Sequence, residues 1–301
     1  MSNAPLNTVA PSPPPWAADA TTHPSPTRAR HELVIEPAGR WPRIDFAELW
    51  EFRQLLFFLV WRDLKVRYAQ TVLGIGWAVL QPVLSVLIFT IIFGRFAKVP
   101  SNGVPYALFS LAAVVPWTYF STAFSGASNS LVASSNLITK VYFPRLVVPL
   151  APVLAGIVDL AIGFGVLAVM MVVYRHGPGP AVWIVPILVL LTAMTAAGVG
   201  AWLAALNIQY RDVKHLVPFL SQIWMYASPV VYPVTLVPER YRLLYAINPL
   251  VGITEGFRVA LLGTGALPWQ LLGVSTAVVV VLFVSGAMYF RRTERLFADV
   301  A

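Results

Sequence analysis

Cysteine is absent from this 301-residue sequence, which excludes disulfide bonds and cysteine-based metal sites. The four histidines, His23, His31, His176 and His215, are scattered without the spacing of metal ligands, so the sequence predicts no metal site. A G-x-x-x-x-G-K-[ST] phosphate-binding loop is also missing, so the chain shows no nucleotide site of its own. Its 13 acidic residues are too few and too scattered for the cluster at one membrane face that a membrane enzyme needs.

Charged residues are scarce as well. They make up 11% of the chain, whereas a soluble domain carries about 25%. Hydrophobic residues make up 58%, and the net charge is +8. The first forty residues lack the apolar core of a secretory signal peptide. This composition is typical of an all-α polytopic membrane protein, in which several apolar helices cross the bilayer.

The sequence divides into three parts. Residues 1–43 are rich in proline, and we expect a disordered cytoplasmic tail because such a segment buries too little apolar surface to fold. Residues 44–70 contain an apolar core, Leu55–Trp61, that is far shorter than the ~20 residues of a span and is flanked by charges. We interpret them as an amphipathic helix in the membrane interface, although a helix packed against other protein fits the pattern equally well. Residues 71–301 form the transmembrane domain.

Six apolar segments predict six transmembrane helices. They cover about Gly74–Phe93, Tyr106–Gly126, Leu146–Tyr174, Val182–Leu206, Leu216–Tyr232 and Trp269–Phe290. Most of the 21 Lys and Arg residues lie in the segments on the side of the termini. The positive-inside rule therefore places both termini in the cytoplasm.

The stretch between the last two predicted spans, Ser228–Arg258, is apolar but broken by prolines, which remove backbone donors. Irregular backbone at membrane depth survives only where it is buried in protein or lines a water-filled path. We therefore expect short re-entrant helices here, with an external loop carrying a surface helix as the alternative. Glu255 and Arg258 are spaced to form a local pair. The residues singled out in this stretch are Pro238, Glu239, Asn248, Pro249, Glu255 and Arg258.

Asp159 is the one clear ionisable residue near the middle of a predicted span. Such residues are costly in a bilayer and often functional. We favour an ion pair with a neighbouring span or subunit over a proton relay, because a relay needs several ionisable groups and this span offers one.

Two further features have more than one interpretation. The polar loops Asn129–Lys140 and Tyr210–His215 lie on the predicted cytoplasmic side, where each is either a docking site for a partner or a solvated turn. Several aromatic residues in or near the spans either form a surface along which sugars slide or belong to an ordinary interfacial belt. These are Tyr119, Phe120, Trp224, Tyr226 and Tyr232.

Three segments resemble a known family. Trp61–Pro100 (WRDLKVRYAQTVLGIGWAVLQPVLSVLIFTIIFGRFAKVP), Asn207–Pro233 (NIQYRDVKHLVPFLSQIWMYASPVVYP) and Ile247–Arg258 (INPLVGITEGFR) are similar to the permease subunits of type-2 ABC exporters. The branch they resemble exports O-antigen, capsule or teichoic acid polysaccharides. The similarity covers about Ile44–Phe290 and is more specific for the superfamily than for the cargo.

The resemblance implies a homodimeric permease in the bacterial inner membrane, with two copies of a separate ABC ATPase. It also implies that the permease catalyses no covalent reaction and holds no cofactor, because ATP and magnesium are bound by the ATPase. No nucleic-acid partner is implied. The second-to-third loop would carry the coupling helix that contacts the ATPase, with the fourth-to-fifth loop near the same partner. The implied contact residues are Ser134, Ser135, Asn136, Leu137, Ile138, Thr139, Lys140, Tyr210, Arg211 and Asp212.

The resemblance also implies a cargo, a glycan linked to undecaprenyl diphosphate and embedded among membrane lipids. The basic residues Arg62, Lys65 and Arg67 then become candidates for binding the diphosphate at a cytoplasmic gate, since a cationic cluster suits a phosphate. Anchoring to anionic headgroups is an equally good role for each of them singly. Two alternatives stay open: a permease of the same architecture for a drug or simple lipid, and a membrane enzyme that acts on polyprenyl phosphates.

Overall fold

The computed structural model describes residues 50–69, 74, 76–138, 140, 143–210 and 212–294. All of them belong to one compact unit, Arg40–Ala301. The predicted tail, residues 1–43, lies outside the described residues, as do the ends of the predicted interfacial helix, residues 44–49 and 70. The described part is a bundle of helices and contains no strand, which confirms the predicted all-α membrane fold.

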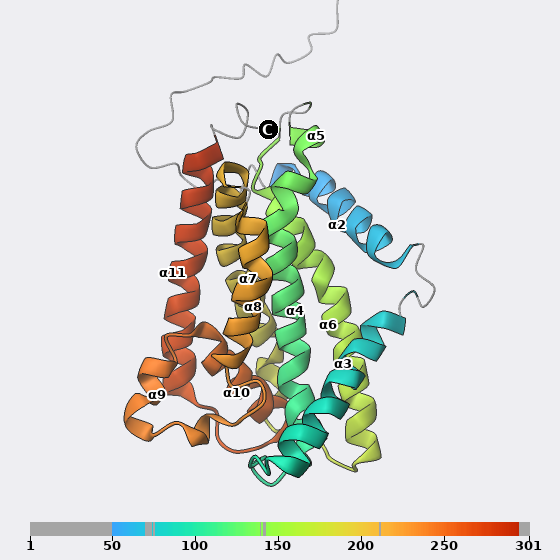
Figure 1. Cartoon of the computed structure of the whole chain (residues 1–301), viewed down its shortest axis with the longest axis vertical. Helices are drawn as coiled ribbons and strands as arrows, with labels where there is room; N and C mark the ends of the chain where they lie inside the picture. Colours follow the sequence, from blue (N-terminus) through green and yellow to red (C-terminus); the bar gives the residue numbers. More distant parts are fainter. Residues whose placement is uncertain are drawn as a thin grey trace, which may run out of the picture. The chain divides into compact units, whose positions relative to one another are not determined.

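The helices follow one another along the chain with short connections (Figure 1). In chain order they are α2 (Arg53–Tyr68), α3 (Gly76–Phe89) with a π-helical continuation η3 (Thr90–Phe96), α4 (Tyr106–Ala133), α5 (Ser135–Ile138), α6 (Val147–Val173), η4 (Val182–Ile184), α7 (Val185–Gln209), α8 (Val213–Tyr226), η5 (Val234–Leu236), α9 (Glu239–Tyr245), α10 (Pro249–Leu262) and α11 (Trp269–Thr293).

Five helices of the described part are long and apolar enough to cross a membrane. They are Gly76–Phe96, Tyr106–Ala133, Val147–Val173, Val182–Gln209 and Trp269–Thr293. The fifth predicted span, Leu216–Tyr232, is instead the 14-residue helix α8, which ends at Tyr226. A 14-residue helix is about 21 Å long and falls short of the ~30 Å hydrocarbon core. Pro229 explains the early end, because a proline disfavours helical backbone in the residue before it.

The centre of the bundle is α4, which contacts α3, α6, α7, α8 and α10. Of its most apolar stretch, 83% is buried, against 11% for the span Gly76–Phe96. Small residues permit this packing. A Cβ on Gly126 would lie 2.8 Å from Pro152, and one on Gly200 would lie 2.5 Å from Ala127. α4 is therefore a protein-surrounded helix, whereas α3 packs on its neighbours along a narrow strip.

The broken stretch after α8 forms two short helices at the end of the bundle that lies opposite α5 (Figure 1). α9 has no buried residue, whereas nearly every side chain of α10 is buried. α10 packs against α4, α7 and α11. An external loop with a surface helix would leave this backbone in solvent, so the structure supports the re-entrant alternative for α10 and a surface position for α9.

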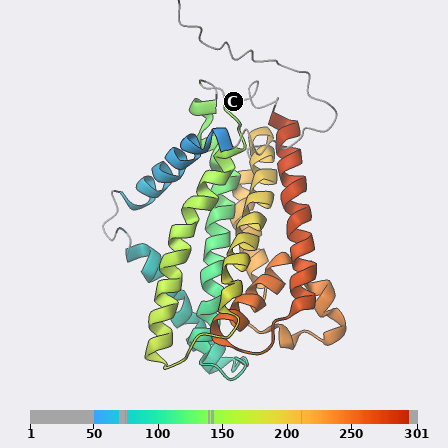
Figure 2. The same cartoon turned by 180° about the vertical axis from the view of Figure 1, so that it is seen from behind.

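The predicted interfacial helix is α2, which leans against α6 near the end that carries α5 (Figures 1 and 2). Leu59 is fully buried against Val147 and Ala151 of α6. The opposite side exposes large apolar side chains, with Phe57 70% and Trp61 59% exposed. One side of α2 therefore packs on protein, and the other presents aromatic rings of the kind found at bilayer interfaces, whose position at a membrane surface stays a prediction.

α7 and α11 cross closely at two glycines. A Cβ on Gly198 would lie 2.7 Å from the Cα of Phe283, and a Cβ on Gly286 would overlap the carbonyl oxygen of Gly198. Small residues let helix backbones approach in membranes, where apolar burial alone gives little driving force. The ring of Trp202 stacks on Tyr289 one turn further along the same contact. The two helices form a tightly fitted pair.

Gly286→Ala is expected to lower the free energy of unfolding by about 1–3 kcal/mol, because the added methyl group forces α7 and α11 apart. Gly273→Ala is the matched control in the same helix, since a Cβ there meets nothing within 4 Å. Both variants gain the same helix propensity, so the difference between them isolates the crossing. Thermal unfolding in detergent measures both, and equal transition temperatures would contradict the close contact.

Candidate functional site

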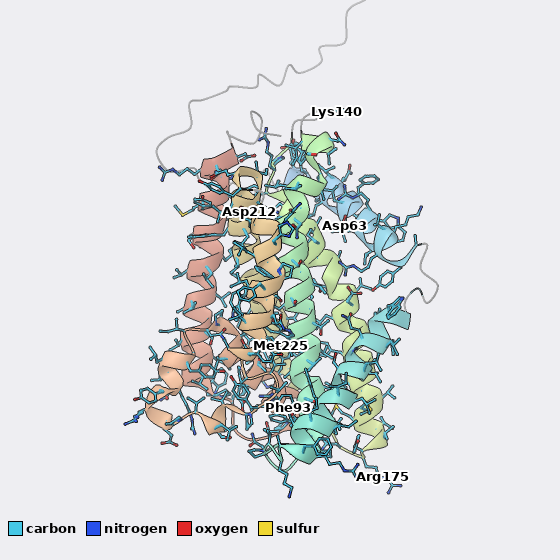
Figure 3. The ribbon with its side chains drawn as sticks, in the orientation of Figure 1. Asp63, Phe93, Lys140, Arg175, Asp212 and Met225 are labelled. Atoms are coloured by element: carbon cyan, nitrogen blue, oxygen red, sulfur yellow. The ribbon has the colours of Figure 1, made fainter. Side chains whose placement is uncertain are left out.

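A cavity of about 690 Å³ opens between α2, α3, α4, α6 and α8. Its volume falls in the range of small-molecule sites, about 300–1,000 Å³. Gln81 of α3, Ser221 and Gln222 of α8, and Asp159 of α6 contribute polar groups to its wall. Met225, labelled on α8 in Figure 3, contributes an apolar part of the wall.

The wall from α4 is a row of hydroxyl groups, which we call the hydroxyl stripe: Thr118, Ser121, Thr122 and Ser125. These positions follow the i, i+3, i+4, i+7 spacing that places residues on one face of a helix. They are partly or fully exposed in a helix that is otherwise almost wholly buried. Thr122 donates to the carbonyl of Thr118, and the hydroxyls of Ser121 and Ser221 lie 2.7 Å apart. The part of α4 that is left uncovered beside the cavity is therefore polar.

The predicted mid-span acid, Asp159, is paired, as expected. Its partners are the last two residues of α2: the guanidinium of Arg67 and the hydroxyl of Tyr68 each donate to a different carboxylate oxygen. All three residues line the cavity. The side chains of Arg67 and Asp159 are 31% and 19% exposed, so the pair is accessible from the cavity. Within the single chain, the partner is α2 rather than a neighbouring span.

The other two basic residues of the predicted gate have different surroundings. Arg62 forms an ion pair with Asp63, 2.9 Å away, and Lys65 is exposed. Arg67 is the member of the set that reaches the cavity. The three side chains do not converge on one point of the described structure, and their role in binding a diphosphate stays a prediction.

The predicted coupling residues lie at the end of the bundle opposite α9 and α10. Lys140 and Asp212 are labelled toward this end in Figure 3, with Arg175 at the other. Asn136 and Lys140 are exposed, and so is Tyr210, whereas Ser134 and Ile138 are buried. Ser135 and Leu137 are half-buried in α5. Thr139 and Arg211 fall outside the described residues.

Two contacts hold α5 to the rest of the bundle. Leu137 packs in the cluster that Leu59 of α2 forms with Val147. After α5, Arg145 donates from its guanidinium to the carbonyl oxygen of Glu294, at 2.6 Å, just beyond α11. The backbone N–H of Arg145 also donates to the carboxylate of Glu294. No feature of the sequence predicted this long-range contact.

The predicted channel aromatics do not share one surface. Tyr119 lines the cavity and donates its hydroxyl to the carbonyl of Val153. Phe120 is fully buried and stacks on Phe124, and Trp224 meets both rings edge-on. Tyr226 is 60% exposed at the end of α8. Their contact with a cargo stays a prediction; in the single chain, Phe120 and Trp224 build the core.

Asn248 joins the end of α8 to the start of α10. Its side-chain oxygen accepts from the backbone N–H of Leu250, as an N-cap does, and from the indole N–H of Trp224 at 2.9 Å. Its amide nitrogen donates to the carbonyl of Ala227 and the hydroxyl of Ser228, both at 2.9 Å. Pro249 follows at the first helical position, where its missing N–H costs nothing.

Arg258 is fully buried and holds the irregular segment between α8 and η5. Its guanidinium donates to the carbonyls of Val230, at 2.8 Å, and Tyr232, at 3.1 Å. Its charge faces Glu255 at 3.4 Å, as the spacing predicted, and lies 3.8 Å from the centre of the Phe109 ring. A single side chain therefore supplies donors to two backbone carbonyls of the irregular segment that contains Pro229 and Pro233.

A tyrosine pair extends this network toward α9. The hydroxyls of Tyr232 and Tyr245 lie 2.9 Å apart, and Tyr232 also donates to the carbonyl of Tyr226. Burial, followed by the hydrogen bond to Tyr232, raises the pKa of Tyr245 above its ordinary value, so it stays neutral at all physiological pH values. Pro238 precedes the first residue of α9, Glu239, which forms an exposed pair with Arg242.

Arg258→Ala is expected to destabilise the protein by about 3–5 kcal/mol, because it leaves Glu255, whose side chain is only 12% exposed, without its partner. Arg258→Lys keeps the charge but loses the planar fork, so its loss is smaller but measurable. Arg240→Ala is the control in the same stretch, since Arg240 is exposed over the Tyr241 ring. Thermal unfolding of the three purified variants ranks their stabilities. A stability of Arg258→Ala equal to that of the wild type would refute the structural role of Arg258.

The comparisons with known proteins cover the same helices. The family model described as ABC-2 type transporter matches residues 54–262. The O-antigen export system permease protein RfbA of Myxococcus xanthus is 29% identical over 251 residues, which are 82% of this chain and 95% of that protein. RfbA of Klebsiella pneumoniae is 27% identical over 247 residues, 82% and 94% of the two chains. The polysialic acid transport protein KpsM of Escherichia coli is 24% identical over 241 residues, 78% and 92%.

The family match begins in α2 and ends at the last residue of α10. It includes both contacts to Asp159, the hydroxyl stripe and the Arg258 network, and it spans well over half of the 301 residues. The chain is therefore a member of the ABC-2 type transporter family.

Proposed function

We propose that this protein is the membrane subunit of an ATP-driven exporter that moves a lipid-linked polysaccharide out of the cytoplasm. An ABC-2 permease works with a separate ATPase, in line with the missing phosphate-binding loop. The cargo proposal draws on the relatives, which are named as permeases for O-antigen and as a transport protein for polysialic acid.

The observation that carries the cargo proposal is the hydroxyl stripe. Hydroxyl groups both donate and accept hydrogen bonds, which suits a sugar chain with many hydroxyls of its own. A drug or simple lipid with a large apolar part gains little from such a wall. The exposed ring of Trp77 and the buried ring of Trp117 lie in the same cavity, where an amphipathic aromatic surface accepts the apolar face of a sugar.

The proposed assembly is a homodimer with two ATPase subunits. α8 packs on α4 through Val217 and Ser221 and leaves Phe219 62% and Ile223 48% exposed. The span Gly76–Phe96 is also largely exposed beside the same cavity. A second copy placed against these faces would turn the half-open cavity of one chain into an enclosed path.

The proposed orientation puts α5 and both termini in the cytoplasm of a multi-pass inner-membrane protein. Lys140, Lys214 and the last-turn residues Arg291 and Arg292 of α11 favour this direction under the positive-inside rule. The exposed residues Asn136 and Lys140 would then face the ATPase. ATP and magnesium would be bound by that partner, and the permease would contribute the path.

A strain deleted for this gene is expected to accumulate undecaprenyl-linked glycan inside the cell and to lose glycan from its surface. Complementation with Thr118→Val/Thr122→Val should restore export to roughly a tenth of the wild-type rate, because the wall loses two hydroxyls without changing shape, about 1.4 kcal/mol in all. Quantifying intracellular and surface glycan measures both effects.

Thr192→Val/Thr195→Val is the matched control. Its two hydroxyls are buried in α7 and bond only to carbonyls of the same helix in the described structure, so export should stay near wild type. Absence of glycan both inside and outside the deleted strain would instead favour an enzyme of polyprenyl phosphate metabolism. Unchanged amounts of glycan inside the cell and at its surface would contradict a polysaccharide cargo and favour a small amphiphile.

A further inference from the structure

Two glutamines in the cavity wall have side-chain amides without partners. Gln81 lies in the span Gly76–Phe96 and Gln222 lies in α8, and both are exposed side chains that line the cavity. Neither amide makes a hydrogen bond within the described part of the chain. An amide turned toward lipid is costly, because hydrocarbon offers it no hydrogen bond. The two glutamines therefore indicate a cavity whose occupant is polar.

Gln81 shares its side of α3 with an aromatic ring. Trp77 precedes it by four residues, a spacing that makes two side chains neighbours on the surface of a helix. The indole is 53% exposed and lines the same cavity. A flat ring accepts the apolar face of a sugar, and an amide beside it both donates to and accepts from sugar hydroxyls. This part of α3 therefore offers a partner to each of the two surfaces of a sugar ring.

The cavity wall has no net charge. Among the described residues that line it, Arg67 and Asp159 are the charged ones, and they are paired with each other. The helices that border the cavity agree with this balance, since α4, residues 70–94 and residues 216–226 contain no charged residue. The polar groups that remain for a ligand are amides and hydroxyls, which are neutral at every physiological pH.

An ionised carboxylate is a poor occupant of such a wall. It only accepts hydrogen bonds, and it loses hydration on entry that a cation would have to replace. The guanidinium of Arg67 is already held by Asp159. The face of an aromatic ring is the negative part of its quadrupole, so the Trp77 ring is unfavourable for an anion as well. The hydroxyls of an uncharged sugar both donate and accept, which matches the amides of Gln81 and Gln222.

We propose that Gln81 and Gln222 are specificity-determining residues that select an uncharged glycan. Each amide hydrogen-bonds to sugar hydroxyls, the Trp77 ring stacks on a sugar face, and the hydroxyl stripe of α4 binds the same chain. Acidic glycans are excluded by the cost of placing carboxylates against this wall. The inference rests on the proposed export function, which it narrows from lipid-linked polysaccharides in general to those without acidic sugars.

Two probes that differ only in sugar charge test the selection. They are hexasaccharides of galactose and of galacturonic acid, each linked to undecaprenyl diphosphate, so the carrier contributes equally to both. The complete complex with its ATPase is placed in nanodiscs of phosphatidylcholine at physiological ionic strength, which screens charges outside the cavity. Displacement of the radiolabelled galactose probe by each unlabelled probe gives the two affinities. The galactose probe is expected to bind about tenfold more tightly.

A charge placed at either amide should change this preference in opposite directions. Gln81→Lys and Gln222→Lys each supply a cation, and each should strengthen binding of the galacturonic acid probe about fivefold, the upper end for an accessible ion pair. Gln81→Glu and Gln222→Glu should weaken it by a similar factor. Gln270→Lys is the matched control, because Gln270 is exposed in α11 and does not line the cavity. This control should leave both affinities within twofold of the wild type.

Gln81→Met/Gln222→Met removes both amides with little change in size. It should weaken binding of the galactose probe about tenfold, for two lost hydrogen bonds, and so narrow the preference. Size-exclusion elution and thermal transitions identify any variant that misfolds. The selection would be overturned if the wild-type complex did not bind the galactose probe or bound the acidic probe equally well. Wild-type affinity of the methionine variant for galactose would overturn the role of the amides.

The proposed function fails separately, through unchanged glycan in the deleted strain. A normal export phenotype of the deletion together with intact selection between the probes would keep the uncharged-sugar site and discard polysaccharide export as its use. Glycan that accumulates in the deleted strain, together with equal binding of the probes, would keep the exporter and discard the selection. The accumulated glycan should contain no uronic or sialic acid, and an acidic glycan would overturn the inference.

Discussion

The buried guanidinium of Arg258 is the interaction on which the end of the bundle opposite α5 depends. A chain that breaks its helix at membrane depth leaves carbonyls without partners, and such groups are costly away from water. Arg258 supplies donors to two of them, at Val230 and Tyr232, and its charge is balanced by Glu255. The side-chain amide of Asn248 likewise donates to the backbone carbonyl of Ala227. Because these two side chains donate hydrogen bonds to the carbonyls that follow α8, this helix can end at Tyr226 and α10 can lie in the interior of the bundle.

Features that depend on local sequence could be predicted, and those that depend on distant partners could not. The apolar runs predicted the five full-length spans, since hydropathy and length are properties of a segment alone. The fifth run, Leu216–Tyr232, was predicted too long, because its average hydropathy hides the helix-ending effect of Pro229 on the preceding backbone. Re-entrant helices were expected in the broken stretch, but which of the two short helices is buried could not be predicted, because the burial of α10 depends on α4, α7 and α11 meeting it in space.

The site shows the same division. The hydroxyl stripe could have been predicted, because Thr118, Ser121, Thr122 and Ser125 have helical spacing within an apolar span. It was missed because uncharged polar residues in a span are a weaker signal than charged ones. Asp159 was recognised as a paired acid, whereas its partner, Arg67, lies 92 residues away and could not be named. The positions of the aromatics predicted nothing about which rings face the core, and Phe120 is fully buried.

Packing is uneven across the bundle, with one tightly packed side and one loosely packed side. α7 and α11 are locked by backbone contact at Gly198 and Gly286, whereas the span Gly76–Phe96 leaves most of its surface uncovered. Any widening of the cavity is therefore expected to come from one wall, as α3 swings while the hydroxyl-bearing wall keeps its shape. In the proposed exporter, a cavity that widens on one side would keep one set of contacts constant for glycans of different width, so tolerance to branching would belong to the α3 wall and recognition of the sugar backbone to the hydroxyl stripe.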